Sequence, residues 1–290
     1  TLSEGLLFKC GRIRKIGRVD HKDAYLDTYE LERERGITIF SKQAVFSMGD
    51  MEVTLLDTPG HVDFSAEMER TLQVLDYAIL VINGADGVQG HTMTLWRLLA
   101  RYQIPTFLFI NKMDQDGTDK EKLLAELKKR LSDNCVDFTW EISDLQSRFL
   151  EDISVCDEEL LEKYLETEEI STSDIRKVIK ERKLFPCFFG SALKMTGVEE
   201  FLHGLEKYCE TPTYPSEFGA KVFKIARDDQ GNRLSYMKIT GGTLKVKELL
   251  TDTEKADQIR IYSGVKFELA KEAPAGTICA VTGLSQTHPG

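Results

Sequence analysis

Apolar residues follow two patterns along the chain: a helical repeat, which predicts helices, and continuous short runs, which predict strands. A helical repeat predicts helices over residues 2–11, 64–75, 92–102 and 198–208, and a helix carrying the stripe Leu123, Leu124, Leu127 and Leu131. Continuous apolar runs predict strands over residues 77–83, 106–110 and 183–189. Strands alternating with helices are typical of a parallel sheet with helices on both faces, so the fold class is α/β.

Residues 37–46 and 52–56 precede this alternation and predict a hairpin turning at Gly49. Residues 12–35 are polar with few apolar anchors, which predicts a long surface loop. Thr118 followed by Glu121 resembles a capping box and predicts the start of the leucine-striped helix. The acidic residues 151–169 indicate a solvated helix face.

Two prolines within residues 211–216 predict a linker. Short strand-like runs with glycine-bearing turns come next, over residues 221–226, 233–240, 242–246, 258–262 and 277–282. This spacing predicts a small antiparallel β-barrel. We therefore expect one domain over residues 1–215 and a second over residues 216–290.

The chain has 290 residues, of which 41% are hydrophobic and 9% aromatic, as expected of folded globular domains. No apolar run approaches the ~18 residues of a membrane span, and the first residues lack a secretory-signal pattern. The 6 cysteines stand singly, without a Cys-x-x-Cys pair, which argues against a zinc site or a disulfide framework. We expect a cytoplasmic monomer with no membrane association.

The net charge is −10, which argues against unspecific wrapping of nucleic acid. The charge is uneven, because residues 221–290 hold 11 Lys and Arg against 8 Asp and Glu, a net +3. Residues 1–220 therefore carry −13, and the two predicted domains present different surfaces.

A polar motif, Asp57-Thr58-Pro59-Gly60-His61, directly follows the strand at residues 52–56. The carboxyl ends of strands in open α/β sheets face ligands. An Asp there can hold Mg²⁺ through water, and a Gly lets a backbone N–H approach a terminal phosphate. Taken alone, the motif is equally typical of a turn that ends a strand.

A second motif, Asn111-Lys112-Met113-Asp114, closes the strand at residues 106–110. An Asp that accepts from the guanine N1–H and amine selects guanine, because adenine would leave the carboxylate unpaired. Asn111 would reach the base edge and join the loops, while the stem of Lys112 packs along the base. The alternative is an Asn and an Asp that only form a turn.

Two weaker signals complete the set. Ser191-Ala192-Leu193 follows the strand at residues 183–189, where a small residue can offer its backbone N–H to the guanine carbonyl oxygen. Thr38, which ends Arg35-Gly36-Ile37-Thr38, places a hydroxyl where it can ligate Mg²⁺ and sense a γ-phosphate. Thr38 alone could equally be a helix cap or a strand residue.

In this order the motifs resemble the switch I, switch II and guanine-recognition motifs of the P-loop GTPases, in the form found in translational GTPases. The resemblance implies a P-loop GTPase-type sheet, GTP or GDP as ligand, and Mg²⁺ held by Thr38 and, through water, by Asp57. It also implies that His61 positions the water that attacks the γ-phosphate, the role of a Gln in other GTPases. The alternative for His61 is a solvent-facing loop histidine.

Three segments look like the ribosomal protection proteins of tetracycline resistance: Asp114-Gln115-Asp116-Gly117, Leu160-Leu161-Glu162-Lys163-Tyr164 and Lys221-Val222-Phe223-Lys224-Ile225. This resemblance covers the first two of about five domains. It implies the ribosome as partner, with tetracycline involved only indirectly, and a second domain that contacts ribosomal RNA mainly through phosphates.

Two alternatives stay open. Elongation factor G is similar, but it usually has an Arg in place of Gln115 and a larger insertion between the guanine motifs. A non-catalytic GTPase-like binding module is the other alternative. Residues 1–290 contain no Gly-x-x-x-x-Gly-Lys-[Ser/Thr] motif, and Thr1-Leu2-Ser3-Glu4 resembles the residues that come directly after that motif. We expect the chain without it to be inactive and to hold phosphates poorly, having lost several hydrogen bonds of about 1.5–3 kcal/mol each.

Overall fold

The computed structural model describes residues 1–17, 25–26, 38, 41–60, 65–139, 146–250 and 253–290. The chain forms two compact units. The first combines Thr1–Lys9 with Leu75–Glu210, and the second combines Cys10–Val74 with Thr211–Gly290.

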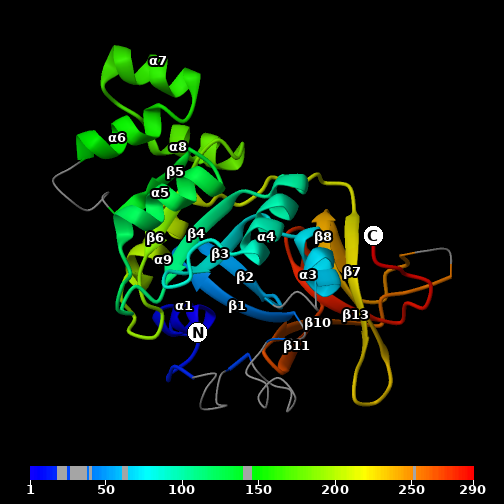
Figure 1. Cartoon of the computed structure of the whole chain (residues 1–290). Helices are drawn as coiled ribbons and strands as arrows, with labels where there is room; N and C mark the ends of the chain where they lie inside the picture. The colour runs from blue at the N-terminus through cyan, green and yellow to red at the C-terminus, as the bar shows by residue number, and fades with distance from the viewer. Residues whose placement is uncertain (18–24, 27–37, 39–40, 61–64, 140–145, 251–252) are drawn as a thin grey trace. The chain divides into compact units, whose positions relative to one another are not determined.

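A parallel sheet is the centre of the first unit (Figure 1). Its strands are β3 (Ala78–Asn83), β4 (Thr106–Asn111), β5 (Cys135–Asp137) and β6 (Phe185–Phe189), in the spatial order β3-β4-β6-β5. Every residue of β6 is buried, and so is every residue of β4 except the last. Such burial requires cover on both faces of the sheet, because neighbouring side chains point to opposite sides.

Aromatic contacts identify this cover. On one face, α9 (Val198–Tyr208) packs Phe201 against Phe109 of β4 and Phe188 of β6, with ring centroids 5.1 Å apart in both pairs. On the other face, α4 (Gly90–Arg101) packs Trp96 against Phe185 of β6 at 4.6 Å. The predicted α/β architecture, with helices on both faces, is confirmed.

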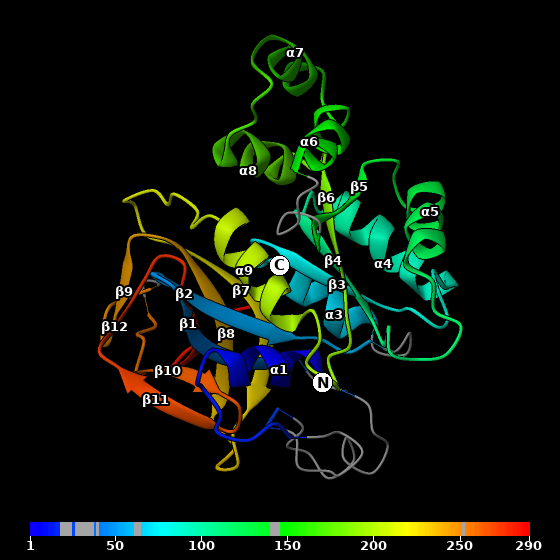
Figure 2. The same cartoon turned by 90° about the vertical axis from the view of Figure 1, so that its left-hand side faces the viewer.

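The other helices described in this unit are α1 (Leu2–Lys9), α5 (Lys120–Arg130), α6 (Gln146–Ser154), α7 (Glu158–Thr167) and α8 (Thr172–Lys180). Figure 2 shows α1 beside α9, where Lys9 pairs with Glu199 at 2.5 Å. Figures 1 and 2 show α6, α7 and α8 grouped at one end of the unit.

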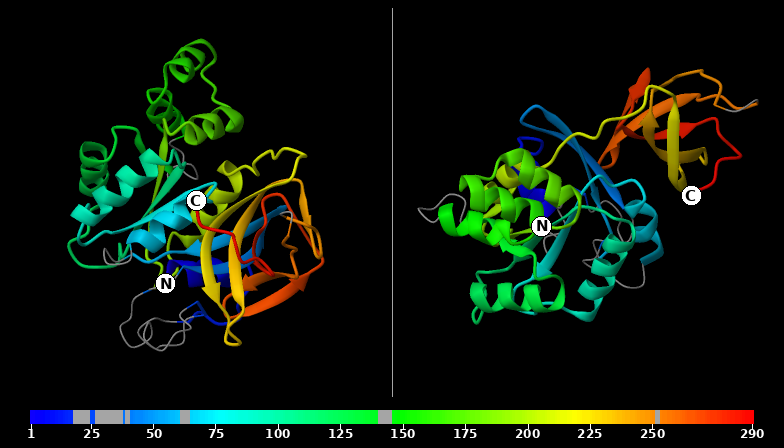
Figure 3. Two further views of the ribbon diagram at one scale, coloured as in Figure 1. Left: turned by 90° about the vertical axis from the view of Figure 1, so that its right-hand side faces the viewer. Right: turned by 90° about the horizontal axis from the view of Figure 1, so that it is seen from above.

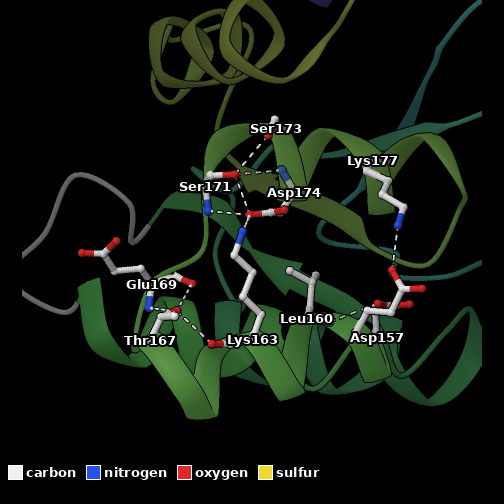
Figure 4. Close-up of polar contacts among 10 residues, drawn as sticks. Asp157, Leu160, Lys163, Thr167, Glu169, Ser171, Ser173, Asp174 and Lys177 are labelled. Atoms are coloured by element: carbon white, nitrogen blue, oxygen red, sulfur yellow. Dashed lines mark hydrogen bonds and ion pairs between the residues drawn. The ribbon is translucent and has the colours of Figure 1, made fainter.

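The acidic residues 151–169 span parts of two helices, α6 and α7, and the acidic side chains of α7 are exposed, as predicted for a solvated helix face. Asp157 caps α7 by accepting from the backbone N–H of Leu160. Ser171 caps α8 in a reciprocal box with Asp174, and Lys163 of α7 pairs with Asp174 at 2.6 Å (Figure 4). The caps satisfy helix-end N–H groups, and the ion pair joins the two helices.

The capping box predicted at Thr118 is wrong. Asp119 caps α5 instead, accepting from the backbone N–H of Lys122 at 3.1 Å. The hydroxyl of Thr118 lies 3.0 Å from the carbonyl oxygen of Met113 and 2.9 Å from that of Gln115. This hydroxyl therefore bonds the preceding loop rather than the helix end.

The second unit contains the predicted hairpin. Its strands are β1 (Lys42–Met48) and β2 (Met51–Asp57), and Gly49 has a positive φ of 57° in the turn between them. The first strand extends two residues beyond its predicted end, because the tight turn lets pairing continue to Met48. Part of the predicted strand at residues 37–46 lies outside the described residues. The helix α3 (Ser65–Leu72) comes after the hairpin.

Within the described residues, seven strands form the antiparallel β domain of this unit (Figure 3). They are β7 (Gly219–Arg227), β8 (Arg233–Gly241), β9 (Thr243–Lys245), β10 (Gln258–Ser263), β11 (Lys266–Ala270), β12 (Glu272–Pro274) and β13 (Ile278–Thr282). One sheet has the order β11-β10-β13-β8-β7, and β12 pairs with β9. Ile239, Leu244, Ile259 and Val281 are fully buried in one core supplied by both sheets. The predicted antiparallel β domain is confirmed.

The β1–β2 hairpin is bonded to this β domain. Gly264 N–H donates to the carbonyl oxygen of Gln43 at 2.8 Å, and the Gln43 side chain donates to that of Ile278 at 3.0 Å. Glu67 of α3 pairs with Lys224 of β7 at 2.9 Å. These bonds explain why residues 10–74 group with residues 211–290.

Candidate functional site

The carboxyl ends of β4 and β6 bring two predicted motifs together. Asn111 is the last residue of β4, and its side-chain oxygen accepts from the N–H of Ala192 at 2.9 Å and from that of Lys112 at 2.8 Å. Met113 N–H donates to the carbonyl oxygen of Gly190 at 3.0 Å. Because β4 and β6 are parallel neighbours, the loops after them meet at one edge of the sheet.

Asp114 lies exposed in this pair of loops. A hydrogen bond from the side chain of Ser191 lowers its pKa, and the nearby charge of Lys194 acts in the same direction. The carboxyl group is therefore ionised at neutral pH and only accepts hydrogen bonds. The guanine N1–H and exocyclic amine need such an acceptor.

The loop after β6 is built around close backbone contacts. Ser191 and Thr196 exchange two backbone hydrogen bonds, of 2.9 and 3.1 Å. A Cβ at Gly190 would lie only 2.3 Å from the carbonyl oxygen of Thr196, so no larger residue fits without a backbone shift. Gly190 and the loop-bonding Thr118 help to hold these two loops, and the motif search missed both. The signal in the sequence that could have found them is their position next to the motifs: Gly190 directly precedes Ser191, and Thr118 comes shortly after Asp114.

The other residues of these two motifs differ in exposure. Ala192 is buried, and its N–H is bonded to Asn111, so a guanine carbonyl oxygen would have to share that bond. Lys112 is exposed and has a positive φ of 64°, uncommon for a residue with a side chain. Met113 is half-buried, and Leu193 is 50% exposed.

The Asp57 motif belongs to the second unit. Asp57 ends β2 and is half-buried, as is Thr58, while Pro59 is buried and Gly60 is exposed. A Cβ built at Gly60 would meet no atom within 4 Å, so packing within the described residues does not require a glycine there. That open space is compatible with the close approach of a ligand. His61 lies outside the described residues.

The predicted magnesium ligands are a carboxylate and a hydroxyl. Thr38 is half-buried in irregular backbone, and Asp57 lies at the end of its strand. Both supply the hard oxygen donors that Mg²⁺ prefers, so the donor chemistry fits this ion. No cluster of three or more His, Cys, Asp or Glu in the described part of the chain could hold a metal ion. None of the helices described is both long and apolar enough to cross a membrane.

Two family descriptions match the chain. "Elongation factor Tu GTP binding domain" matches residues 1–211, and "Elongation factor G domain 2" matches residues 217–289. The fold is that of a crystal structure from Thermus thermophilus, with a TM-score of 0.85 at 23% identity, covering 100% of this chain and 51% of the other. The fold and motifs thus define a guanine-nucleotide-binding domain followed by an antiparallel β domain. The chain belongs to the elongation factor G-like translational GTPases.

Three curated relatives show the range of similarity. Elongation factor G of Ureaplasma urealyticum serovar 10 is 32% identical, over all of this chain and 52% of its own length. Tetracycline resistance protein TetP of Clostridium perfringens is 34% identical, over all of this chain and 48% of its own length. Tetracycline resistance protein TetO of Campylobacter jejuni is 35% identical, over 90% of this chain and 43% of its own length. The chain thus spans about half the length of these relatives.

Proposed function

We propose that this chain is the nucleotide-binding part of a ribosome-dependent GTPase that protects ribosomes from tetracycline. The observation that carries the GTPase part is the joined pair of loops after β4 and β6. There Asn111 bonds the N–H of Ala192, and Ser191 bonds the ionised Asp114. This arrangement supplies a fixed acceptor for guanine, while adenine would leave the acceptor unpaired.

The catalytic half of the proposal rests on the other motifs. Thr38 and Asp57 would hold Mg²⁺, which neutralises phosphate charge when it is bound. The N–H of Gly60 would bind the γ-phosphate, in the open space beside that residue. His61 would orient the attacking water, and the ribosome would bring it into its active position. The more basic residues 221–290 would contact ribosomal RNA through phosphates.

The lengths of the alignments support the protection type. The alignment with the Ureaplasma elongation factor G has 360 positions, so at least 70 of them have no counterpart in these 290 residues. The alignment with TetP has 323 positions, so the corresponding minimum is 33. The smaller difference means that TetP carries fewer additional positions relative to this chain than the Ureaplasma elongation factor G does. The match of residues 217–289 to elongation factor G domain 2 favours a translocation factor as the second candidate.

The deciding experiment measures release of labelled tetracycline from ribosomes by the full-length protein, with GTP and separately with ATP. Release with GTP alone is the expected result. Hydrolysis of GTP on ribosomes without release would instead identify a translocation factor. If no hydrolysis occurs, the protein is a binding module.

Asp114→Asn tests the guanine site in the same protein. We expect the preference to move from guanine toward xanthine, whose 2-oxo group replaces the amine that the carboxylate accepts from. Asp116→Asn is the matched control, because Asp116 is an exposed acid two residues away. Unchanged nucleotide preference in the Asp114 variant would contradict the base-reading role.

A further inference from the structure

The strand β11 forms one edge of the five-stranded sheet and pairs only with β10 among the described strands (Figure 2). Its side chains are unusually apolar for such an exposed position. Phe267 is 42% exposed and Leu269 64%, and Val265 in the preceding turn is 65% exposed. An exposed edge strand leaves a row of N–H and C=O groups unpaired and is a template for pairing with another strand.

The backbone of β11 offers hydrogen-bonding groups at this edge. Its hairpin with β10 closes at the pair Ser263–Lys266, across the two turn residues Gly264 and Val265. The closing pair of such a hairpin is a hydrogen-bonded one, and hydrogen-bonded pairs alternate with open ones along the ladder. Phe267 and Leu269 therefore occupy open positions. Their N–H and C=O groups point away from β10, toward the free edge.

The ring of Phe267 is already ordered by its own sheet. It lies 5.2 Å from the ring of Tyr262, and the guanidinium carbon of Arg260 is 4.6 Å from its centroid. A contact with this ring would thus require little new ordering of the side chain. Preorganised aromatic groups favour association because less conformational freedom is lost on binding.

We propose that β11 pairs with β11 of a second copy of this chain, antiparallel, about a two-fold axis through Phe267. In this register the two Phe267 residues lie opposite each other, and Val265 of each copy lies opposite Leu269 of the other. The outward-pointing N–H and C=O groups of both strands then meet. The contact is isologous, as in most closed dimers.

The charges of β11 select this register. Lys266 of each copy lies opposite Glu268 of the other, which gives two complementary pairs. A register shifted to place the axis at Glu268 would set two carboxylates directly opposite each other, which is unfavourable. Both Lys266 and Glu268 are exposed, and neither has an ion-pair partner among the described residues. Their charges are therefore available to the second copy.

The contact is small. Five residues from each copy form far less than the roughly 1,600 Å² of a standard interface. Association is therefore weak and depends on concentration, and the dilute protein is the monomer expected from its sequence. This inference concerns β11 alone and does not depend on the proposed GTPase function.

The test uses two oppositely charged variants of the whole 290-residue chain. Lys266→Glu makes both charged positions of β11 acidic, and Glu268→Lys makes both basic. Each variant alone should dissociate at least about tenfold more readily than the wild type, as measured by sedimentation velocity over a range of concentrations. An equimolar mixture should restore association, because the acidic and basic strands complement each other.

The controls place the same charge changes elsewhere on the β domain. Lys255→Glu and Glu272→Lys alter exposed residues outside β11 and outside the paired segment 265–269, and should leave association unchanged. Circular dichroism checks that every variant is folded. Amide hydrogen exchange at Phe267 and Leu269 should slow as the wild-type concentration rises. A wild type that is monomeric at every concentration, or a mixture no more associated than its components, would overturn the proposal.

Discussion

Asn111 is the residue whose replacement tests the described site most directly. Its side-chain oxygen accepts two backbone N–H groups, from Ala192 at 2.9 Å and from Lys112 at 2.8 Å. Asn111→Ala removes the acceptor for both. Lys112 is exposed, so water can replace its bond, but Ala192 is 1% exposed and its N–H would be buried without a partner. An unsatisfied buried donor costs about 1–3 kcal/mol, and we expect stability to fall by that amount.

Urea denaturation followed by circular dichroism measures this loss. With a slope of about 2 kcal/mol/M, a loss of about 2 kcal/mol lowers the midpoint by about 1 M. Because the chain forms two compact units, the shift should affect the transition of the unit that contains β4 and β6. An alanine variant that unfolds at the wild-type midpoint would refute the assignment of Asn111 as the tie between the loops.

Asn111→Asp is the matched control for binding. An aspartate keeps a side-chain oxygen for both N–H groups, so the loss of stability should be less than about 1 kcal/mol. It also replaces the amide N–H₂ that would face the base, and we expect guanine-nucleotide affinity in the full-length protein to fall at least about tenfold. Equal affinity of the aspartate variant and the wild type would mean that Asn111 has only a structural role.

Three further predictions concern other residues. His61→Ala in the full-length protein should spare GTP binding but slow ribosome-stimulated hydrolysis by orders of magnitude; equal turnover would reject its assignment. Burial alone would raise the pKa of Asp174, but hydrogen bonds from Lys163 and Ser171 outweigh it and lower the pKa to about 2. The resulting stabilisation, about 1–2 kcal/mol after discounting for partial exposure, is present above pH ~4 and lost as the pH falls toward ~2. Asp174→Asn should therefore flatten the acid limb of thermal stability measured against pH, and an unchanged limb would contradict this. Gly204→Ala gains helix propensity but brings a Cβ to 2.4 Å from the ring of Phe188. We expect a net loss of about 1–3 kcal/mol in urea denaturation, and a gain would show that the ring moves aside.

Local patterns predicted several elements closely. The helix predicted over residues 198–208 is α9, and the run predicted over residues 106–110 is β4, which has one more residue at its end. Both have a strong apolar repeat set by burial. Two of the missed strands have weak patterns: β5 has three residues, and β11 is exposed along most of its length. A short or exposed strand forms because a neighbouring strand pairs with it. The apolar pattern of the segment itself does not show which strand that neighbour will be.

The same distinction holds for the cap at Thr118. Its spacing to Glu121 matches a capping box, but Asp119 takes the cap, and the Thr118 hydroxyl bonds the loop before it. Thr118 and Asp119 are adjacent, and either side chain could cap the helix. The path of the preceding chain decides which of them does. That path is set by Met113, whose N–H bonds Gly190 in a loop far away in the sequence.

Residue type and spacing were enough to predict the α/β class, the order of the motifs and their positions after strands, because these properties act locally. Contacts in the folded chain set which motif residues bond one another. Asn111 reaches Ala192, 81 positions along the chain, because β4 and β6 are parallel neighbours in the sheet. Such contacts also group residues 10–74 with the β domain. The bond between Asn111 and Ala192 and the grouping of residues 10–74 with the β domain both bring together segments that are distant in the sequence. The local spacing of residues does not specify which distant segments will meet.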